Sequence, residues 1–401
     1  MPEGDQAGFG AASELSGAVL STAALARMEG AEITAALSAE PPQKGEDSDE
    51  AAATRAALLR QFSLQRMIGY GMELGDALSL RRLVEDGYDW TPTGLWLAER
   101  CRSLAEWERR DGRSAAEADA LRRAAACFRI AQVVSESDSD ERRRVYGLGE
   151  ETFALAVKAD ARYRRVSLPH REGAVVAWLY SPTATWREPV VAVIGGVEGW
   201  ALDLEGYAVA LGQRGLATML LDGPGQGQTR FQSRHYLSER SIDALCDVVA
   251  HACQELFGGR PIGVWGNSLG GTFAMHLAAR SPWVAACCNN GGPREPIGLS
   301  ARPRFFLKMQ AMCGEVDQRR ARAVFESLAL TEASVRARCP VLVVHGGVDP
   351  LLSYEESRWL CEAAGPGNDL VLIPDGDHAI YNRPADKFAV VGGWFASRLR
   401  R

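Results

Sequence analysis

One short stretch of the sequence combines a nucleophile with the backbone freedom needed to present it. Residues 266–271 read Gly-Asn-Ser-Leu-Gly-Gly, with Ser268 at the centre of a G-x-S-x-G pattern. The strand-like run Pro261–Trp265 precedes this stretch and a helix-like run follows it. Glycines on both sides permit the sharp strand-to-helix turn that lifts a serine hydroxyl clear of a sheet. The pattern alone is weak, but this context predicts that Ser268 is a nucleophile. The alternative is a glycine-rich helix entry with an incidental serine.

A serine hydroxyl is a poor nucleophile unless a base takes its proton, so a histidine is expected near Ser268. The chain has six histidines. His170 and His235 lie well before Ser268, His251 and His276 fall within helix-like patterns, and His345 ends a strand-like run. Only His378 stands in a polar loop after a strand, in the order serine, acid, histidine that such turns use. The sequence therefore predicts His378 as the base.

The acid that orients this histidine is expected between Ser268 and His378 in the chain. Asp349 follows a strand-like run through a glycine-containing turn. Asp375 and Asp377 are rivals because they lie close to His378. Asp349 is favoured because it follows the preceding strand, whose end would lie on the same sheet edge as Ser268.

Attack on a carbonyl also needs backbone amides that stabilise the resulting oxyanion. We expect the amide of Leu269 and one amide from the loop 195–200, which reads Gly-Gly-Val-Glu-Gly-Trp. Within this loop Val197 is the first choice and Gly196 the second. Glu198 has two interpretations: an exposed loop carboxylate, or a second catalytic group that orients the substrate or handles a proton.

A second glycine cluster follows a strand-like run at residues 222–229, which read Asp-Gly-Pro-Gly-Gln-Gly-Gln-Thr. A dinucleotide-binding G-x-G-x-x-G pattern would need glycine at position 228, where this chain has Gln228. The chain has no Gly-Lys dipeptide, which excludes a phosphate-binding P-loop. We interpret the cluster as a tight turn at the edge of the active site, and we predict no cofactor and no metal.

These candidate residues belong to a region in which strand-like and helix-like runs alternate, which is typical of a mostly parallel sheet with helices on both faces. The expected strands are Ala174–Tyr180, Val190–Ile194, Leu216–Leu221, Ile262–Trp265, Val284–Cys288, Val341–Val344 and Leu370–Ile373. Ligands of open sheets of this kind bind at the carboxyl ends of the strands. The predicted fold is therefore α/β, with the candidate site at that edge.

The chain divides into three segments by sequence pattern. Residues 1–50 are rich in small residues and end in an acidic run, which predicts a flexible or weakly helical leader. Residues 51–165 have helical periodicity, and we expect three to five helices that form an accessory or cap domain. Residues 166–401 form the expected catalytic domain. Within it, residues 294–330 interrupt the alternation and predict a helical lid over the carboxyl edge of the sheet.

Composition limits the location and the partners. The 46% hydrophobic fraction is ordinary for a folded protein, and the net charge of −6 argues against nucleic acid as a partner. No apolar run is long enough for a membrane span, and the first residues lack the basic start of an export signal. The nine scattered cysteines indicate reduced thiols. We expect a cytoplasmic protein with no membrane partner, and a homodimer is one option.

The motifs together resemble the α/β-hydrolase superfamily. They are the loop 195–198, the turn 222–227, the turn 266–271, Asp349 and His378. More narrowly, the chain is similar to the branch with an N-terminal helical domain, over about residues 55–400. That branch includes the 2,6-dihydroxypseudooxynicotine hydrolases, the fungal yellowish-green polyketide-shortening hydrolases and the fermentation-respiration-switch esterase-like proteins. The resemblance implies an α/β-hydrolase fold and carries over four site residues, which are Ser268, Asp349, His378 and Glu198.

The resemblance and the residues together predict a serine hydrolase acting on an activated carbonyl. The expected substrate is an aryl ketone or a polyketide-like compound, either a small molecule or a carrier-bound acyl group. The expected reaction is cleavage of a carbon–carbon bond in retro-Claisen fashion, or of an ester. The alternatives are a carboxylesterase or thioesterase, an acyltransferase, or a lyase that eliminates an acyl group from a natural product. A non-catalytic binding module is disfavoured by the complete set of serine, acid and histidine.

Overall fold

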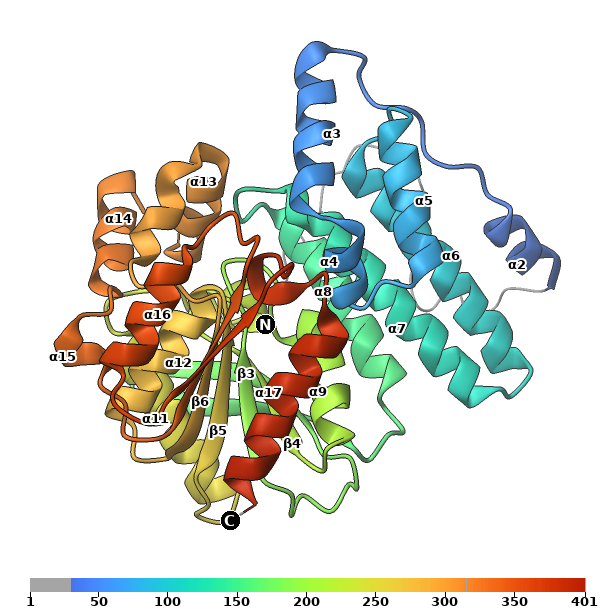
Figure 1. Ribbon diagram of the computed structural model, residues 1–401. Helices are drawn as coiled ribbons and strands as arrows, with labels where there is room; N and C mark the ends of the chain where they lie inside the picture. The colour runs from blue at the N-terminus through green and yellow to red at the C-terminus, as the bar shows by residue number, and fades with distance from the viewer. Residues whose placement is uncertain (1–29, 315, 401) are drawn as a thin grey trace, which may run out of the picture.

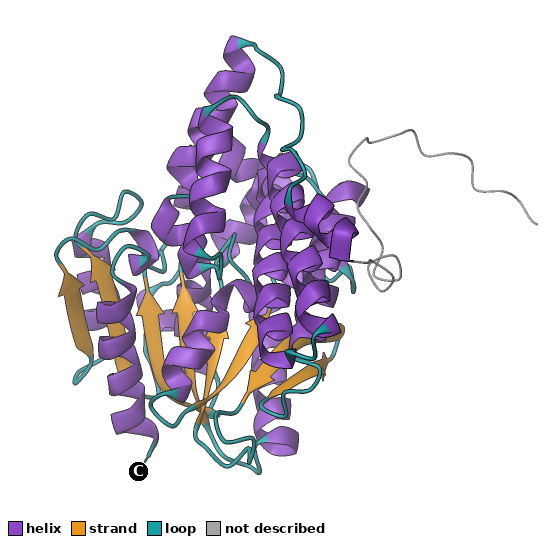
Figure 2. Cartoon of the chain, turned by 90° about the vertical axis from the view of Figure 1, so that its right-hand side faces the viewer, coloured by secondary structure: helices purple, strands orange, loops and turns teal. Residues whose placement is uncertain are grey.

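The structure, a computed structural model, places a helical region against the carboxyl end of a mostly parallel sheet (Figure 1 and Figure 2). It describes residues 30–314 and 316–400. Most of the predicted leader, residues 1–29, therefore lies outside the described residues.

The helical region consists of consecutive helices, most of which are joined by short turns. They are α2 (Gly30–Leu37), α3 (Asp49–Gln61), α4 (Leu64–Gly69), α5 (Leu74–Glu85), α6 (Trp90–Arg110), α7 (Ser114–Ala131), the short turn η1 (Gln132–Val134) and α8 (Asp140–Ala156).

More helices are present in this region than the three to five expected, because side chains restart the helix after very short breaks. Ser63 separates α3 from α4 and accepts a hydrogen bond from the amide of Arg66, which is the contact of an N-capping residue. Ser139 caps α8 in the same way. Hydrophobic periodicity alone runs through such breaks, so it underestimates the number of helices.

The last part of the predicted leader is ordered in the structure. Residues 30–37 form α2, which packs against α6, and Ile33 of this helix is buried. Ser48 caps α3 two residues before the predicted boundary. Residues 30–37 therefore agree with the weakly helical alternative, and not with a flexible leader that extends to residue 50. The apolar side of α2 was hidden by the low complexity of the surrounding sequence.

The sheet has eight strands in the order β1-β2-β4-β3-β5-β6-β7-β8. Strands β1 and β2 are antiparallel to their neighbours, and β3 to β8 run parallel. Their bounds are β1 (Tyr163–His170), β2 (Gly173–Tyr180), β3 (Val190–Ile194), β4 (Ala217–Asp222), β5 (Ile262–Asn267), β6 (Val284–Asn290), β7 (Val341–Gly346) and β8 (Asp369–Ile373). The seven predicted strands correspond to β2 to β8. Strand β1 was not among them because it is a largely exposed edge strand that contains two arginines.

Helices cover both faces of the sheet, as the alternating pattern predicts. They are η2 (Ala201–Leu204), α9 (Glu205–Gly212), α10 (Gly227–Phe231), α11 (Ser241–His251), η3 (Ala252–Leu256), α12 (Leu269–Arg280), α15 (Glu332–Val335), α16 (Tyr354–Ala363), η5 (His378–Ile380) and α17 (Pro384–Leu399). Alternate residues of the central strand β3 enter two separate cores. Ala192 and Ile194 pack with α11 and α12, while Val191 and Val193 pack with α9 and α17. The buried faces hold the strand ends, and thus the candidate site, in a fixed position.

The interruption predicted at residues 294–330 lies between β6 and β7. It forms η4 (Pro296–Ala301), α13 (Pro303–Met312) and α14 (Gln318–Ser327). Figure 1 shows α13 beyond the sheet, on the same side as the helical region. Within the described residues, no helix is both long and apolar enough to cross a bilayer.

Candidate active site

The candidate nucleophile lies in a strained turn between β5 and α12. Ser268 has φ 53° and ψ −129°, a left-handed backbone conformation that is costly for a residue with a side chain. A Cβ atom at Gly266 would overlap the carbonyl oxygen of Gly270, and one at Gly270 would overlap that of Ile194. Only glycine fits at these two positions, so the G-x-S-x-G spacing follows from the geometry of the turn.

The structure brings the three predicted residues of the triad together. His378 Nε2 lies 2.9 Å from Ser268 Oγ, and His378 Nδ1 lies 2.8 Å from Asp349 Oδ2. The second distance fits an imidazole N–H donating to a carboxylate, which leaves Nε2 free to accept the serine proton. The Asp349 side chain is buried, whereas those of Ser268 and His378 are partly exposed. The reacting atoms are therefore accessible, while the acid is shielded.

Burial alone would raise the pKa of Asp349. The hydrogen bonds that Asp349 accepts from His378 and from the backbone amides of Leu351 and Leu352 together have a larger, opposite effect. The pKa of Asp349 therefore lies below its ordinary value. Asp349 is ionised at neutral pH, as the orienting acid must be. The lowered pKa favours the carboxylate form of Asp349, which stabilises an imidazolium.

The rival acids have other partners. Asp375 pairs with Arg383, and both side chains are exposed. Asp377 accepts hydrogen bonds from the backbone amides of Tyr381 and Asn382 and so shapes the histidine turn. Of the three candidates, only Asp349 is hydrogen-bonded to the His378 ring.

The loop after β3 lies against the nucleophile. A Cβ at Gly196 would lie 2.9 Å from Ser268 Cβ, so this backbone approaches the serine as closely as glycine allows. Gln226, from the second glycine cluster, donates to the carbonyls of Gly195 and Gly196 at 2.7 and 2.9 Å. Both hydrogen bonds fix the loop. The cluster at 222–229 thus has the structural role of positioning this loop.

Among the described residues, no acceptor is recorded for the amide of Val197. Leu269 is the first residue of α12, and the first amides of a helix have no acceptor within that helix. Both amides are therefore available for an oxyanion, and their assignment stays a prediction.

Glu198 is not an exposed loop carboxylate. Its side chain is buried, accepts a hydrogen bond from Gln61 Nε2 at 2.6 Å and forms a short ion pair with Lys308 of α13. Arg66 of α4 lies 3.6 Å away. The loop that approaches the nucleophile is thus anchored to the helical region and to the inserted helices through one carboxylate.

The electrostatics of Glu198 do not favour the predicted role in handling a proton. Burial would raise its pKa, but the charges of Lys308 and Arg66 outweigh burial and lower the pKa below its ordinary value. At neutral pH the carboxylate therefore has no proton to give and is already bound by two cations. The geometry favours an anchoring role for Glu198, and a catalytic role stays a prediction.

A second contact joins the helical region to the loop 195–200 and to the turn that holds His378. Arg66 donates to the hydroxyl of Tyr70, at the end of α4, through Nε at 3.1 Å and Nη2 at 2.9 Å. The Tyr70 hydroxyl lies 3.3 Å from the carbonyl oxygen of Glu198 and 3.2 Å from the hydroxyl of Tyr381. Tyr381 follows His378 by three residues. One tyrosine therefore bridges the loop 195–200 and the turn that holds His378.

Sequence reasoning did not identify Arg66, Tyr70, Lys308 or Tyr381. For Lys308 a signal was present: the chain contains only four lysines among many arginines, and this one interrupts an apolar stretch. The other three lie in segments whose local pattern gives no sign of their neighbours in space.

Removing the carboxylate of the Glu198–Lys308 ion pair should strongly destabilise the fold. Replacing Glu198 by glutamine leaves Lys308 buried beside Arg66 without a counter-charge, which should lower the free energy of unfolding by about 3–5 kcal/mol. Lys308→Met removes one cation while Arg66 and Gln61 still bind the carboxylate, so its effect should be smaller. The double variant should lose less than the sum of the two single losses, as measured by urea unfolding.

The pH dependence provides a control for this prediction. The folded pKa of Glu198 lies below that of the unfolded chain, so its stabilisation is complete above about pH 4.5 and is lost as the pH falls through the folded pKa. The difference in stability between the native chain and Glu198→Gln should therefore shrink below pH 4.5. A difference that does not change with pH would contradict the ionic origin of the effect.

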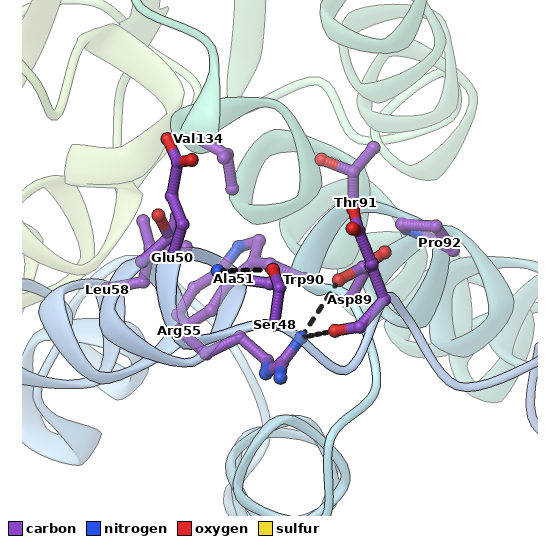
Figure 3. Close-up of a pocket in the computed structure, with 12 residues that line it drawn as sticks. Ser48, Glu50, Ala51, Arg55, Leu58, Asp89, Trp90, Thr91, Pro92 and Val134 are labelled. Carbon is purple, nitrogen blue, oxygen red and sulfur yellow. Dashed lines mark hydrogen bonds and ion pairs between the residues drawn. The ribbon is translucent and has the colours of Figure 1, made fainter.

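A cavity of about 450 Å³ lies in the helical region, apart from the triad. Its walls come from α3, the start of α6 and η1, and include Leu58, Trp90 and Val134 (Figure 3). Arg55 crosses it to reach Asp89 at 3.6 Å. None of the predicted site residues lines this cavity, so we do not assign the reaction to it.

One buried group among the described residues has the spacing of metal ligands. Asp76, Cys101 and Cys127 place three ligand atoms within 4.8 Å of one another. Arg123 donates two hydrogen bonds to the Asp76 carboxylate, at 3.0 and 3.1 Å, and thereby already neutralises its charge. The group lies in the helical region and contains none of the predicted site residues.

Comparison with known proteins gives matches in sequence and in structure. The profile described as the alpha/beta hydrolase family matches residues 186–391. The 2,6-dihydropseudooxynicotine hydrolase of Paenarthrobacter nicotinovorans is 29% identical over 206 residues, which are 50% of this chain and 55% of that protein. The 20-hydroxy-prefusarin hydrolase FUS2 of Gibberella moniliformis is 26% identical over 270 residues, 61% of this chain and 64% of that one. The match thus spans less than two thirds of either relative.

The crystal structure of the 2,6-dihydroxy-pseudo-oxynicotine hydrolase superposes with a TM-score of 0.73 and 24% identity. The superposition covers 84% of this chain and 96% of that one. It shows a shared fold.

Proposed function

Because the chain belongs to the alpha/beta hydrolase family, we propose that it is a serine hydrolase that cleaves an activated carbonyl compound. The observation that carries this proposal is the hydrogen-bonded series from Ser268 Oγ through His378 to Asp349, with both contacts below 3 Å. In this proposal Ser268 is the nucleophile, His378 the general base and acid, and Asp349 the group that orients the imidazole. The helical region acts as a cap over the site.

In the first half of the reaction, Ser268 Oγ attacks the carbonyl carbon while His378 Nε2 takes the hydroxyl proton. The carbonyl electron pair moves to the oxygen, and the amides of Leu269 and Val197 donate to this oxyanion. The imidazolium that forms is stabilised by the ionised Asp349. This step needs no group outside the chain and the substrate.

In the second half, the oxyanion re-forms the carbonyl and expels a leaving group. If that group is a carbanion stabilised by a neighbouring carbonyl or arene, a carbon–carbon bond breaks and His378 returns its proton to the carbon. If it is an alkoxide or thiolate, an ester or thioester is cleaved. Water activated by His378 then releases the acyl group from Ser268 as a carboxylic acid.

Two observations support an aryl ketone or polyketide-like substrate, either free or carried as an acyl group. The matched relatives are named hydrolases of 2,6-dihydropseudooxynicotine and of 20-hydroxy-prefusarin, neither of which is named as a simple ester. The cap and the inserted helices, which enclose the loop at Glu198, provide a large cover for such a substrate. Carboxylesterase, thioesterase, acyltransferase and acyl-eliminating lyase activities remain alternatives that use the same triad.

The proposal is tested by labelling and by product analysis. A fluorophosphonate probe should modify the chain once, on the peptide that contains Ser268, and should block hydrolysis of a p-nitrophenyl ester. An aryl β-diketone should then give a carboxylic acid and a ketone in equal amounts if the carbon–carbon bond is cleaved. Ester hydrolysis without diketone cleavage would favour the esterase alternative. Absence of both labelling and hydrolysis would contradict the proposal.

A further inference from the structure

Two of the four lysines of this chain are buried, and both lie beside catalytic loops. Lys308 binds Glu198, as described above. Lys387, in the first turns of α17, is only 1% exposed. Its Nζ donates to the hydroxyl of Tyr207 at 2.7 Å and to the backbone carbonyl of Ala379 at 3.1 Å. Among the described residues no carboxylate forms an ion pair with it, so charge pairing does not explain its burial.

The carbonyl that Lys387 binds belongs to a strained turn. Ala379 and Ile380, which directly follow His378, both have φ 57°. Left-handed conformations are uncommon for residues with a side chain and are outliers for a β-branched one. Such strain persists only where surrounding contacts hold it in place. Here the turn determines where the His378 ring points.

A buried polar network connects this turn to the nucleophile. Asn290, at the end of β6, donates through Nδ2 to the Ala379 carbonyl at 3.1 Å and to Asn267 Oδ1 at 2.8 Å. The Tyr207 hydroxyl donates to the same Asn267 oxygen at 3.2 Å. Asn267 directly precedes Ser268. Through Tyr207 and Ala379, Lys387 therefore belongs to a hydrogen-bond network that connects Asn267, the residue before Ser268, with Ala379, the residue after His378.

We propose that Lys387 is a positioning residue for His378: its hydrogen bonds to Ala379 and Tyr207 hold the strained turn so that the imidazole meets Ser268. This inference rests on the proposed function, in which His378 is the general base. Lys387 itself does not contact the reacting atoms.

The surroundings of Lys387 favour a role as hydrogen-bond donor. Its Nζ lies 4.6, 5.0 and 5.3 Å from the ring centres of Tyr207, Tyr381 and Phe388. Burial lowers the pKa of Lys387 to about 7, although the charge of Asp377 opposes this shift. The protonated and the neutral amine both carry N–H groups, so the two hydrogen bonds can be made in either state.

Lys387→Met tests the inference, because methionine keeps the length of the side chain and removes the donor. Lys158→Met, at an exposed position on the turn after α8, is the matched control. We expect Lys387→Met to lower kcat for a p-nitrophenyl ester by about tenfold or more while KM stays unchanged, since a displaced base slows chemistry rather than binding. Lys158→Met should keep the kcat of the native chain.

A proton NMR readout keeps this test separate from the proposed function. The downfield resonance of the His378 Nδ1–H, which donates to Asp349, reports the position of the ring even if no substrate is turned over. We expect this resonance to shift or broaden in Lys387→Met and to stay unchanged in Lys158→Met. An unchanged resonance together with an unchanged kcat would overturn the inference.

Tyr207→Phe provides a second variant in case Lys387→Met does not fold. It removes only the hydroxyl that joins Lys387 to Asn267 and leaves the bond from Lys387 to Ala379 in place. We expect a smaller fall in kcat and a smaller shift of the His378 resonance, with no change in KM. A kcat and a resonance equal to those of the native chain would overturn the inference here too.

Discussion

Replacing Ser268 by alanine should lower kcat for any substrate of this enzyme by about 10⁶-fold. The series of Ser268, His378 and Asp349 works as a unit, and removal of the nucleophile in such a unit costs about this factor. A residual rate above that of water should remain, because the amides of Leu269 and Val197 still surround the carbonyl. The measurement is single-turnover and steady-state hydrolysis of a p-nitrophenyl ester, with fluorophosphonate labelling beside it.

Ser397→Ala is the matched control for this prediction. Ser397 lies on α17, is exposed and bonds only to the carbonyl of Trp394 within the described residues. Its loss should leave labelling and kcat unchanged. Ser268→Ala should in addition keep the unfolding midpoint close to that of the native chain, because the strained turn loses only one hydroxyl. Turnover by Ser268→Ala within 100-fold of the native rate would contradict the assignment of the nucleophile.

Much of the catalytic edge could be predicted from the sequence because local geometry constrains it. The turn at Ser268 admits only glycine at Gly266 and Gly270, so a structural requirement is visible as a motif. The chain order of the sheet then places Asp349 and His378 after neighbouring strands. The predicted α/β-hydrolase fold is confirmed by the observed sheet order and by the family match.

The contacts between the helical region and the catalytic loops could not be predicted from the sequence. Arg66 and Glu198 lie far apart in the chain, and neither has a local pattern that indicates the other. Glu198 was therefore expected to be exposed or catalytic, whereas the structure surrounds it with two cations and an amide. Periodicity reports which side of a helix is buried, but not which residue of another segment it meets.

These contacts indicate how the cap could influence catalysis. Tyr70 touches the carbonyl of Glu198 and the hydroxyl of Tyr381, and Lys387 holds the other side of the same histidine turn. The loop 195–200 and the turn that holds His378 are thus fixed by residues from outside the motifs that define them. We therefore expect reactivity in this chain to depend on packing between segments as well as on the triad itself.

Replacing Asp349 by asparagine should lower kcat by about 10⁴-fold with little change in the backbone. The amide can present its NH₂ group to His378 Nδ1, which favours the ring form whose Nε2 carries the proton and cannot accept one from Ser268. The amides of Leu351 and Leu352 still find an oxygen at this position, so the turn after β7 should persist. The measurement is kcat as a function of pH, compared with the native chain.

The matched control for Asp349→Asn is Asp375→Asn, which removes an exposed carboxylate paired with Arg383 three residues before the histidine. It should leave kcat unchanged, and a large loss in this variant would mean that the acid has been assigned to the wrong aspartate. The pH profile adds a second criterion. The pKa of Asp349 lies below its ordinary value. In the native chain, protonation of Asp349 should therefore lower kcat, as the asparagine substitution does, only at a pH below that ordinary value. In Asp349→Asn this carboxylate is absent, so no loss of activity from its protonation should be seen at that end of the profile.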